Sequence, residues 1–559
     1  MRLTIYAKYV TIIYHISGNN LGKYHRRPPM KNNRLITRLI AVMMALLMLV
    51  LATACANTDG GNDTATTTTS STGNNTPSGD NGDSGNSGNS GDAGNDAADT
   101  SAADTTPKVE LDEYGREIVN PDLPDVTYEG KTFTVHTRGN VEQYEWLAKD
   151  QTGDRLNDAI YARNLAVEDK YGITLEVIAE GTWSNYAKET MPAMQASILA
   201  GNGAYDLIAG YSSPISNMVT TGQLYDLNDL QYINFDKPWW WANFTEASAI
   251  EGTNYFALGA LSLSAIYSLS CVYFNPTMLE ETNPGTDLYQ IVLDGKWTWD
   301  KMTELASNAN SDLDGNSVMD VNDRFGIVMM NNSNPNNQYV VASGEKIATI
   351  GVDGSPSITL DQEKMSTVID NVIKLFYQNE YCYMGAQNDV RKMFIDGKAL
   401  FHSEWLYYAQ TQIASQVEKY GLVPTPKMNE AQENYSAWIQ SGMHMYCIPI
   451  DVKDPERAAI LTEAFAAETY RTLLPQYYEI VLKAKYFKDE ASSQMMDIMY
   501  DSVNFDFARI YDSKLGLVST INSTISSQQN TFASAYKGTS KVAAKQLEGL
   551  LETVAKNSK

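Results

Sequence analysis

Strands and helices alternate regularly between residues 131 and 209, and this alternation limits the folds that the chain can adopt. Asp154 is placed to cap the first helix, and Gly172 is placed to end it. The order predicts a largely parallel sheet with right-handed crossovers. Ligands of such sheets bind at the carboxyl ends of the strands, here after His136 and Ala209. The pattern reads strand, helix, strand, helix, strand at residues 131–136, 155–171, 173–177, 191–199 and 204–209.

The chain is acidic and large enough to bury a substantial core. Residues 108–559 contain all nine Trp, and their length suggests two lobes. The formal net charge is −25, and loss of residues 1–54, which hold eight Lys or Arg and no Asp or Glu, lowers it to −33. A chain with this charge repels phosphate, so we expect no nucleic-acid partner. The chain also has Cys271, Cys382 and Cys447, an odd number of cysteines. Either one disulfide with one free thiol or three free thiols is possible.

Catalytic motifs are scarce. His136, His402 and His444 are the histidines beyond residue 54, and they are widely spaced. The sequence has no HExxH zinc motif, no Gly-x-Ser-x-Gly elbow and no phosphate-binding glycine loop. Carboxylates are numerous, so a glycosidase-like acid pair is not excluded by counting. We expect a binding protein rather than an enzyme, with no catalytic residues to assign.

Residues 312–323 have the ligand spacing of a calcium loop. Ser317 replaces the usual glycine at position 6, and an Asp at position 12 resembles dockerin-type loops. We expect a structural Ca²⁺ between a helix near 299–308 and a strand at 325–330, with a solvated acidic turn as the alternative. The expected ligands, at loop positions 1, 3, 5, 7, 9 and 12, are Asp312, Asp314, Asn316, the Val318 carbonyl, Asp320 and Asp323.

Several motifs resemble those of the extracellular solute-binding lipoproteins of bacterial ABC importers. The similarity is to the family 1, sugar-binding-like branch of Gram-positive bacteria, and it covers roughly residues 127–515. It rests on the runs GDRLNDAIYARN at 153–164, KYGI at 170–173, YDLI at 205–208, KPWW at 237–240, YFNP at 273–276, FIDGKALF at 394–401, GMHMYCIP at 442–449 and DPERAA at 454–459.

The resemblance implies an α/β fold of two lobes, like a type II periplasmic binding protein, with a ligand cleft between them. Residues 394–401 resemble a return crossing, and 442–459 resemble the last strand and helix. We therefore expect a first lobe at about 127–265 and 398–440, and a second at about 266–397 and 441–559. Hinge crossings are expected near 262–270, 398–402 and 436–442.

The sequence also contains aromatic residues that suit a sugar site, because sugar C–H faces stack on aromatic planes while hydroxyls pair with polar side chains. Pro238 places two Trp in a loop, two further candidates follow the expected crossing at 398–402, and one precedes Gly442. Three more candidate binding residues lie in the loop after the first predicted strand. The predicted substrate-binding residues are Trp240, Trp405, Trp146, Trp239, Arg138, Glu145, Glu404 and Trp438.

The N-terminal region predicts export and lipid anchoring. An apolar run at 39–54 follows basic residues and precedes Cys55, which is the pattern of a secretory signal. Residues 51–55 resemble a bacterial lipobox, with Ala52 where Leu is usual, and this implies cleavage before Cys55 and lipid on its sulfur. An uncleaved membrane anchor is the alternative. We expect translation to start at Met30, with 1–29 as a mis-assigned extension, and a signal peptide at 30–54.

Residues 55–107 consist almost entirely of Thr, Ser, Gly, Asn, Asp and Ala, so we expect a disordered tether before the solute-binding domain at 108–559. The expected function is a monomeric, lipid-anchored protein on the extracellular face of the membrane. It would capture a carbohydrate, or another small solute, and deliver it to the transmembrane subunits of an ABC permease. A cell-surface glycan-active enzyme and an adhesin are the alternatives.

Overall fold

The computed structural model describes residues 110–111, 118–477 and 490–557. The chain divides into two compact units, 1–103 and 104–559, and the description below concerns the second. The predicted start at Met30, signal peptide, lipidated Cys55 and tether lie outside the described residues. Within the described ranges, no helix is both long and apolar enough to cross a membrane.

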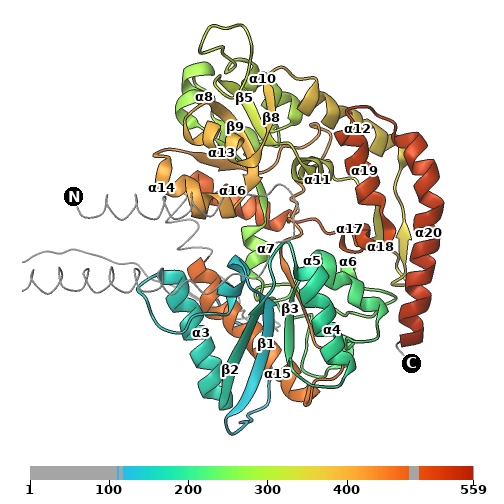
Figure 1. The fold of residues 1–559 in the computed structure, drawn as a ribbon. Coiled ribbons are helices and arrows are strands. Elements are labelled where there is room, and N and C mark those ends of the chain that lie inside the picture. Colours follow the sequence, from blue (N-terminus) through green and yellow to red (C-terminus); the bar gives the residue numbers. More distant parts are fainter. Residues whose placement is uncertain (1–109, 112–117, 478–489, 558–559) are drawn as a thin grey trace, which may run out of the picture. The chain divides into compact units, whose positions relative to one another are not determined.

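The first lobe is built on a four-stranded sheet, which appears at the bottom of Figure 1. The parallel core predicted from the sequence is confirmed, because β1 pairs in parallel with both β2 and β3. Asp154 caps α3 by accepting from the amides of Leu156 and Asn157, and Gly172 ends it in the left-handed conformation. The strand order is β11 (His444–Cys447), β3 (Leu207–Tyr211), β1 (Lys131–Arg138) and β2 (Ile173–Glu180).

The second lobe contains a five-stranded mixed sheet, at the top of Figure 1. Its β5 pairs in parallel with β8 and β9, and β4 runs antiparallel to β9 and β10. The strand order is β10 (Gly421–Val423), β4 (Ser270–Phe274), β9 (Ala399–Trp405), β5 (Phe325–Met330) and β8 (Cys382–Gly385). A separate hairpin joins β6 (Ala348–Ile350) and β7 (Pro356–Ile358).

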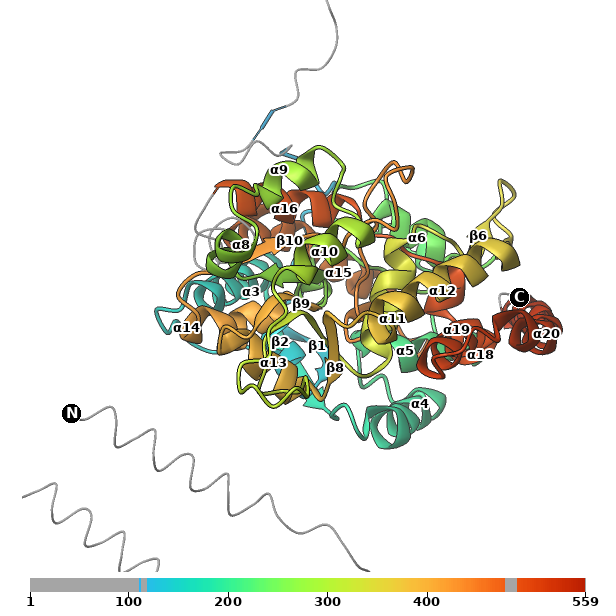
Figure 2. The same cartoon turned by 90° about the horizontal axis from the view of Figure 1, so that it is seen from above.

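Helices cover both sheets (Figures 1 and 2). Those between β1 and β4 are η1 (Val141–Glu145), α3 (Arg155–Tyr171), η2 (Tyr186–Thr190), α4 (Met191–Leu199), α5 (Ser212–Ile215), η3 (Ser216–Thr220), η4 (Leu227–Asp229), α6 (Ala242–Ser248) and α7 (Leu263–Tyr267). Those between β4 and β11 are α8 (Pro276–Thr282), α9 (Leu288–Leu293), α10 (Trp299–Ser307), α11 (Ser333–Ala342), α12 (Gln362–Tyr377), α13 (Gln387–Ile395), η5 (Ala409–Ile413) and α14 (Ala414–Gln416). Those after β11 are α15 (Pro455–Glu468), η6 (Thr469–Leu473), α16 (Glu490–Asp501), α17 (Phe507–Ile510), α18 (Asp512–Leu515), α19 (Leu517–Ser526) and α20 (Phe532–Asn557).

The expected lobe boundaries are wrong in two places. Residues 399–405 were expected to cross back to the first lobe, but they form β9, a buried strand between β4 and β5 of the second sheet. An apolar run such as Ala399–Phe401 suits an interior strand, because side chains on both faces are then buried. Residues 444–447 were assigned to the second lobe, but they pair with β3 in the first, and α15 packs there on α3.

Three segments of chain run side by side where the lobes join. Ser270 N donates to Trp438 O at 2.9 Å, and Gln440 N donates to Ser268 O at 2.9 Å. Residues 502–504 lie on the other side of 437, with Asn504 N donating to Ala437 O at 3.0 Å. Two of the expected crossings, near 262–270 and 436–442, thus coincide with segments that join the lobes, and within the described residues 502–504 is a third such segment.

The C-terminal helices α17–α20 follow this third crossing and contact both lobes. The long helix α20 packs on α12 and α19 on the side of the second lobe, and on η3 of the first lobe. Figure 1 shows it running along one side of both lobes, and Figure 2 shows α18, α19 and α20 on that same side. The family's last helix, expected at 454–459, is thus followed by further helices that pack at the junction.

Candidate ligand-binding site between the lobes

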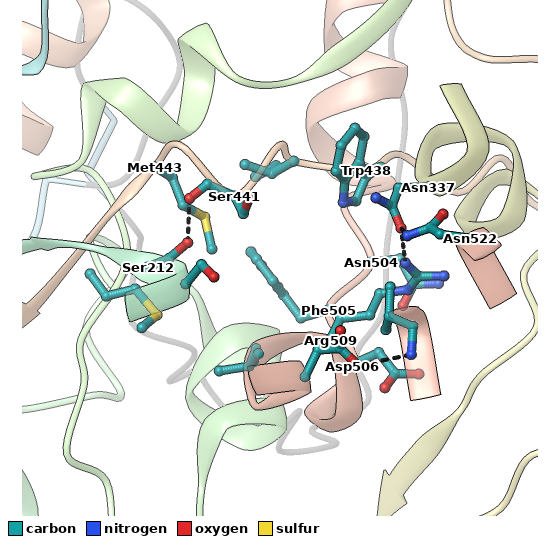
Figure 3. A pocket seen from close by; sticks show the side chains of 16 residues that line it. Ser212, Asn337, Trp438, Ser441, Met443, Asn504, Phe505, Asp506, Arg509 and Asn522 are labelled. Atoms are coloured by element: carbon teal, nitrogen blue, oxygen red, sulfur yellow. Dashed lines mark hydrogen bonds between the residues drawn. The ribbon is translucent and has the colours of Figure 1, made fainter. Parts of the chain in front are cut away.

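A cavity of about 190 Å³ lies where the two lobes and the three crossings meet. The first lobe contributes Ser212 and Met443, the second contributes Asn337, and the crossings contribute Trp438 and Asn504 (Figure 3). Ser212 follows β3 and Asn337 lies on the helix that follows β5. Both positions are at the carboxyl ends of parallel strands, as expected for a ligand site in an α/β fold.

One wall of the cavity is polar. Asn337 Oδ1 accepts hydrogen bonds from Arg509 Nη1 at 3.1 Å and from Asn522 Nδ2 at 3.2 Å. On the first-lobe side, Ser212 Oγ donates to Ser441 O at 2.6 Å. The cavity can therefore offer donors and acceptors to a polar ligand from both lobes.

The other surfaces of the cavity are apolar. Trp438 is 9% exposed and Phe505 is 8% exposed, so each ring presents only a small part of its face. Met443, just before β11, and Met445 of β11 also line the cavity. A ligand that combines an apolar face with polar edges would match these two kinds of wall.

The charged groups that line the cavity are Arg509, Asp506 and Asp512. Burial lowers the pKa of Arg509, while the carboxylates of Asp506 and Asp512 act in the opposite direction. Burial also raises the pKa of Asp512 above its ordinary value. The two carboxylates outnumber the single guanidinium, so the cavity has no excess positive charge to attract an anion.

A larger hollow, of about 610 Å³, lies elsewhere. It is lined by residues of α10 and α12 and by the loops at 378–381 and 428–429, all in the second lobe. Closure of one lobe on the other would leave its walls unchanged. The smaller cavity, which is lined by residues of both lobes, is therefore the better candidate for a ligand held between them.

Trp239 and Trp240 lie in the core of the first lobe rather than in a cleft. Both are buried, and their indole nitrogens each donate to one oxygen of Glu463, at 2.9 Å. Glu463 is on α15 and is itself fully buried. The segment after Pro238 was expected to be an open loop, but it folds back onto this helix. The ligand-facing role predicted for these two Trp is not supported by this arrangement.

Trp146 and Glu145 are also buried inside the first lobe. Trp146 Nε1 donates to Tyr446 Oη at 3.3 Å. One oxygen of Glu145 accepts from the amide of Ser264, and the other lies 3.0 Å from both Tyr446 Oη and His444 Nδ1. All of these contacts are within the protein, so both residues act as structural links between η1, α7 and β11.

Arg138 lies at the carboxyl end of β1, as predicted, but it is covered by two aromatic rings. Its guanidinium carbon is 4.5 Å from the centre of the Trp183 ring and 4.3 Å from that of Tyr211, and Nη2 donates to Gly442 O at 3.1 Å. Trp183 is 51% exposed. The exposed aromatic surface at this end of the sheet therefore belongs to Trp183, beside the Ser441–Gly442 segment.

Glu404 and Trp405 end β9 in the second lobe. Glu404 is buried and pairs with Arg391 of α13, with 2.8 Å between Oε2 and Nε. Trp405 is partly buried, and its ring centre lies 5.9 Å from the Arg391 guanidinium carbon. Within the described part of the chain, Trp438 lines the interlobe cavity and the other seven predicted binding residues do not.

The predicted calcium loop brings three of its six expected ligands together. Carboxylate oxygens of Asp312, Asp314 and Asp323 all lie within 4.8 Å of one another. Amides of Asp320 and Leu313 donate to Asp323, and these bonds hold its pKa below the ordinary value. The loop joins α10 to β5, as predicted. Ser317 adopts φ 63°, the left-handed conformation for which glycine is usual at this position.

Several cavity residues were not predicted from the sequence. Asn337, Arg509 and Asn522 form its polar wall, Asn504 belongs to the third crossing, and Phe505 directly follows that crossing. Asn337 had a usable signal, because an Asn-rich stretch follows the predicted strand at 325–330. The other four lie beyond the expected last helix of the family. No local motif marked them as part of the site.

The sequence left open whether two of the three cysteines form a disulfide. In the structure Cys271, Cys382 and Cys447 are all free.

Comparisons with known proteins agree with this architecture. The chain is similar in structure to the cyclic alpha-maltosyl-1,6-maltose binding protein from Arthrobacter globiformis, with a TM-score of 0.50 and 13% identity over 75% of this chain and 100% of that chain. It is also similar to the galacto-N-biose-/lacto-N-biose I-binding protein of the ABC transporter from Bifidobacterium longum, with a TM-score of 0.49 and 11% identity over 76% and 98% of the two chains. The first of these likenesses shows the two-lobed fold. Comparison with curated protein sequences gives no match.

The sequence itself identifies the family. The family model described as bacterial extracellular solute-binding protein matches residues 166–473, which is more than half of the chain. This family consists of binding proteins rather than enzymes, as expected from the scarcity of catalytic motifs. The chain belongs to the bacterial extracellular solute-binding protein family.

Proposed function

We propose that the protein captures a carbohydrate in the interlobe cavity and delivers it to an ABC permease. The observation that carries the proposal is the composition of the cavity, which joins the Trp438 face to polar side chains from both lobes. Sugars present C–H faces to aromatic rings and hydroxyls to polar groups. The Arthrobacter protein is named for a maltose-derived ligand, so malto-oligosaccharides are the first probes to test.

The mechanism we propose is hinge closure. The three crossings at 268–270, 437–440 and 502–504 lie side by side, so a small change in their backbone angles can rotate one lobe against the other. Their pairing through backbone hydrogen bonds keeps the crossings together during such a rotation. The cavity lies against these crossings, and closure would bury a bound sugar between the first-lobe serines and Asn337.

The test is a glycan array followed by calorimetry on the mature protein. Binding should raise the melting temperature without any turnover of the glycan. Trp438→Ala should weaken binding by about tenfold or more, since stacking contributes roughly 0.5–1.5 kcal/mol beyond area burial and tenfold corresponds to about 1.4 kcal/mol. Trp405→Ala is the matched control, because that ring does not line the cavity.

Two results would contradict the proposal. Cleavage of the glycan would indicate an enzyme, and glycan binding that is unaffected by Trp438→Ala would move the site away from the cavity. If only non-carbohydrate solutes bind, the assignment of a sugar as the ligand is wrong, while the proposed role in solute capture stands.

The lipid anchor at Cys55 is part of the same proposal, and it rests on the lipobox-like sequence at 51–55. Metabolic labelling with a fatty-acid probe should tag the wild-type protein. Cys55→Ala should abolish the tag and release the chain from the membrane fraction, whereas Cys382→Ala should leave the tag unchanged. Labelling that persists in Cys55→Ala would rule out this anchor.

We further propose that the loop at 312–323 binds a structural Ca²⁺. The close approach of the Asp312, Asp314 and Asp323 carboxylates supports the proposal, because like charges held this near are stabilised by a cation. Chelation by EDTA should lower the melting temperature of the wild type, because a metal that binds only the folded form stabilises it. Asp312→Ala should remove this response. An identical melting curve with and without EDTA would indicate a solvated acidic turn.

A further inference from the structure

The side chain of Asn337 is held in one orientation at the wall of the interlobe cavity. Arg509 Nη1 and Asn522 Nδ2 both donate to Asn337 Oδ1, at 3.1 and 3.2 Å. The three residues come from three different helices, α11, α17 and α19. Figure 3 shows them together on one side of the cavity, across from Ser212 and Ser441.

The chemistry of arginine decides which end of the amide faces the cavity. The oxygen and nitrogen of an asparagine side chain are often hard to tell apart by position alone. A guanidinium group has only donors, so the Asn337 atom that faces Arg509 must be the oxygen. The amide nitrogen then lies on the opposite side of the group, toward Trp438, as Figure 3 shows. A molecule in the cavity therefore meets a hydrogen-bond donor at Asn337.

The charges around the cavity limit which kind of ligand acceptor can bind the Asn337 amide donor. Asp506 and Asp512 line the cavity against a single cation, Arg509. Arg509 Nη1 is engaged with Asn337, and Nη2 has no hydrogen-bond partner among the described residues. The two carboxylates outnumber this one cation, so they would repel an added negative charge. The acceptor best suited to this wall is a neutral oxygen.

We propose that Asn337 Nδ2 donates a hydrogen bond to a neutral oxygen, a hydroxyl or ring oxygen, of a sugar unit that lies against Trp438, and that Arg509 and Asn522 are positioning residues for this amide. The inference rests on the proposed function, and it adds a ligand class to it: neutral sugars rather than uronic or other acidic ones. It also assigns recognition to α11 and to the C-terminal helices, which sequence reasoning had left out of the site.

The first experiment inverts the polarity of the amide. Asn337→Asp keeps an oxygen facing Arg509 but replaces the donor in the cavity with an acceptor. Maltotriose, cellotriose and galactotriose are titrated by calorimetry, with trigalacturonic acid as the acidic counterpart. We expect at least one neutral trisaccharide to bind the wild type more tightly than trigalacturonic acid, and its affinity to fall by about tenfold or more in the variant. Asn202→Asp, an exposed residue after α4, adds the same charge and should bind as the wild type does.

The second experiment tests the positioning role with a double-mutant cycle. Arg509→Lys should weaken binding in the wild-type background, and this effect should vanish when Asn337 is already Ala. Equal losses in both backgrounds would show that Arg509 acts on its own. Asn337→Ala also replaces Asn337→Asp as the test of the donor if the Asp variant does not fold.

The outcomes separate this inference from the proposed function. If a neutral trisaccharide binds and Asn337→Asp keeps its full affinity, the donor assignment is overturned while sugar capture stands. If trigalacturonic acid binds most tightly, the neutral class is overturned. If neither these probes nor any glycan on the array binds, the proposed function fails, and this inference fails with it.

Discussion

Replacement of Glu463 by alanine is expected to destabilise the first lobe by about 2–6 kcal/mol. The carboxylate accepts from the indole nitrogens of Trp239 and Trp240 in a fully buried site. Its removal leaves two buried donors without partners, and each such donor costs about 1–3 kcal/mol. Chemical denaturation should show the loss as a lower midpoint. Glu456→Ala, an exposed position on the same helix, is the control and should change the midpoint little. A loss as small for Glu463→Ala as for the control would contradict the buried network.

The same carboxyl group predicts a dependence of stability on pH. Burial raises the pKa of Glu463 from an ordinary 4.5 to about 7, against the opposing effect of the indole hydrogen bonds. Because the pKa is raised in the folded state, this group's contribution to stability is fully present below about pH 4.5 and is lost as the pH rises through about 7. Glu463→Gln cannot ionise and should lack this loss. The melting temperature of the variant, relative to that of the wild type, should therefore rise between about pH 5 and 8. A difference in melting temperature that stays constant over this range would argue against the raised pKa.

Local signals in the sequence were sufficient to predict the parallel part of the first lobe's sheet. Asp154 and Gly172 cap α3 because their chemistry acts on neighbouring backbone groups, so no distant residue is needed to place them. The calcium-like loop was placed between α10 and β5 for the same reason. Elements whose boundaries depend on nearby residues can be predicted from one sequence.

The orientation of individual aromatic residues could not be predicted in this way. Trp240 has its hydrogen-bond partner, Glu463, 223 positions further along the chain. A Trp beside a proline suits an exposed loop and a buried turn equally well, and the distant partner decides between them. Trp438 lines the cavity because it lies in the segment at 437–440 that joins the lobes, and the sequence predicts a crossing there.

The prediction of the lobe boundaries was wrong for a related reason. Residues 399–405 are apolar enough for an interior strand, and the sequence does not say which sheet receives that strand. The third crossing at 502–504 follows α16, and the last sequence motif on which the family resemblance rests ends at residue 459. As a result Arg509 and Asn522 were missed, although they form the polar wall of the cavity with Asn337.

Glu145→Ala is expected to have the other large effect, a loss of about 3–5 kcal/mol in the free energy of unfolding. The carboxylate lies close to three donors, the Ser264 amide, Tyr446 Oη and His444 Nδ1, with no exposed surface. Removal of a buried charged group that is fully hydrogen-bonded leaves its partners unsatisfied, which costs this much in other proteins. Ser264 belongs to α7, the first crossing, so the variant should also loosen the attachment of that crossing to the first lobe.

This expectation can be separated from the ligand-contact role that the sequence suggested for Glu145. Glu145→Gln keeps one acceptor oxygen but turns an NH₂ group toward a donor, so its melting temperature should fall part of the way toward that of Glu145→Ala. Glu176→Ala, an exposed position on β2, should leave the melting temperature unchanged. Glycan affinity measured well below the melting temperature should stay close to that of the wild type in Glu145→Gln, because the carboxylate faces the interior of the lobe. A variant with an unchanged melting temperature and at least tenfold weaker binding would instead show that Glu145 contacts the sugar.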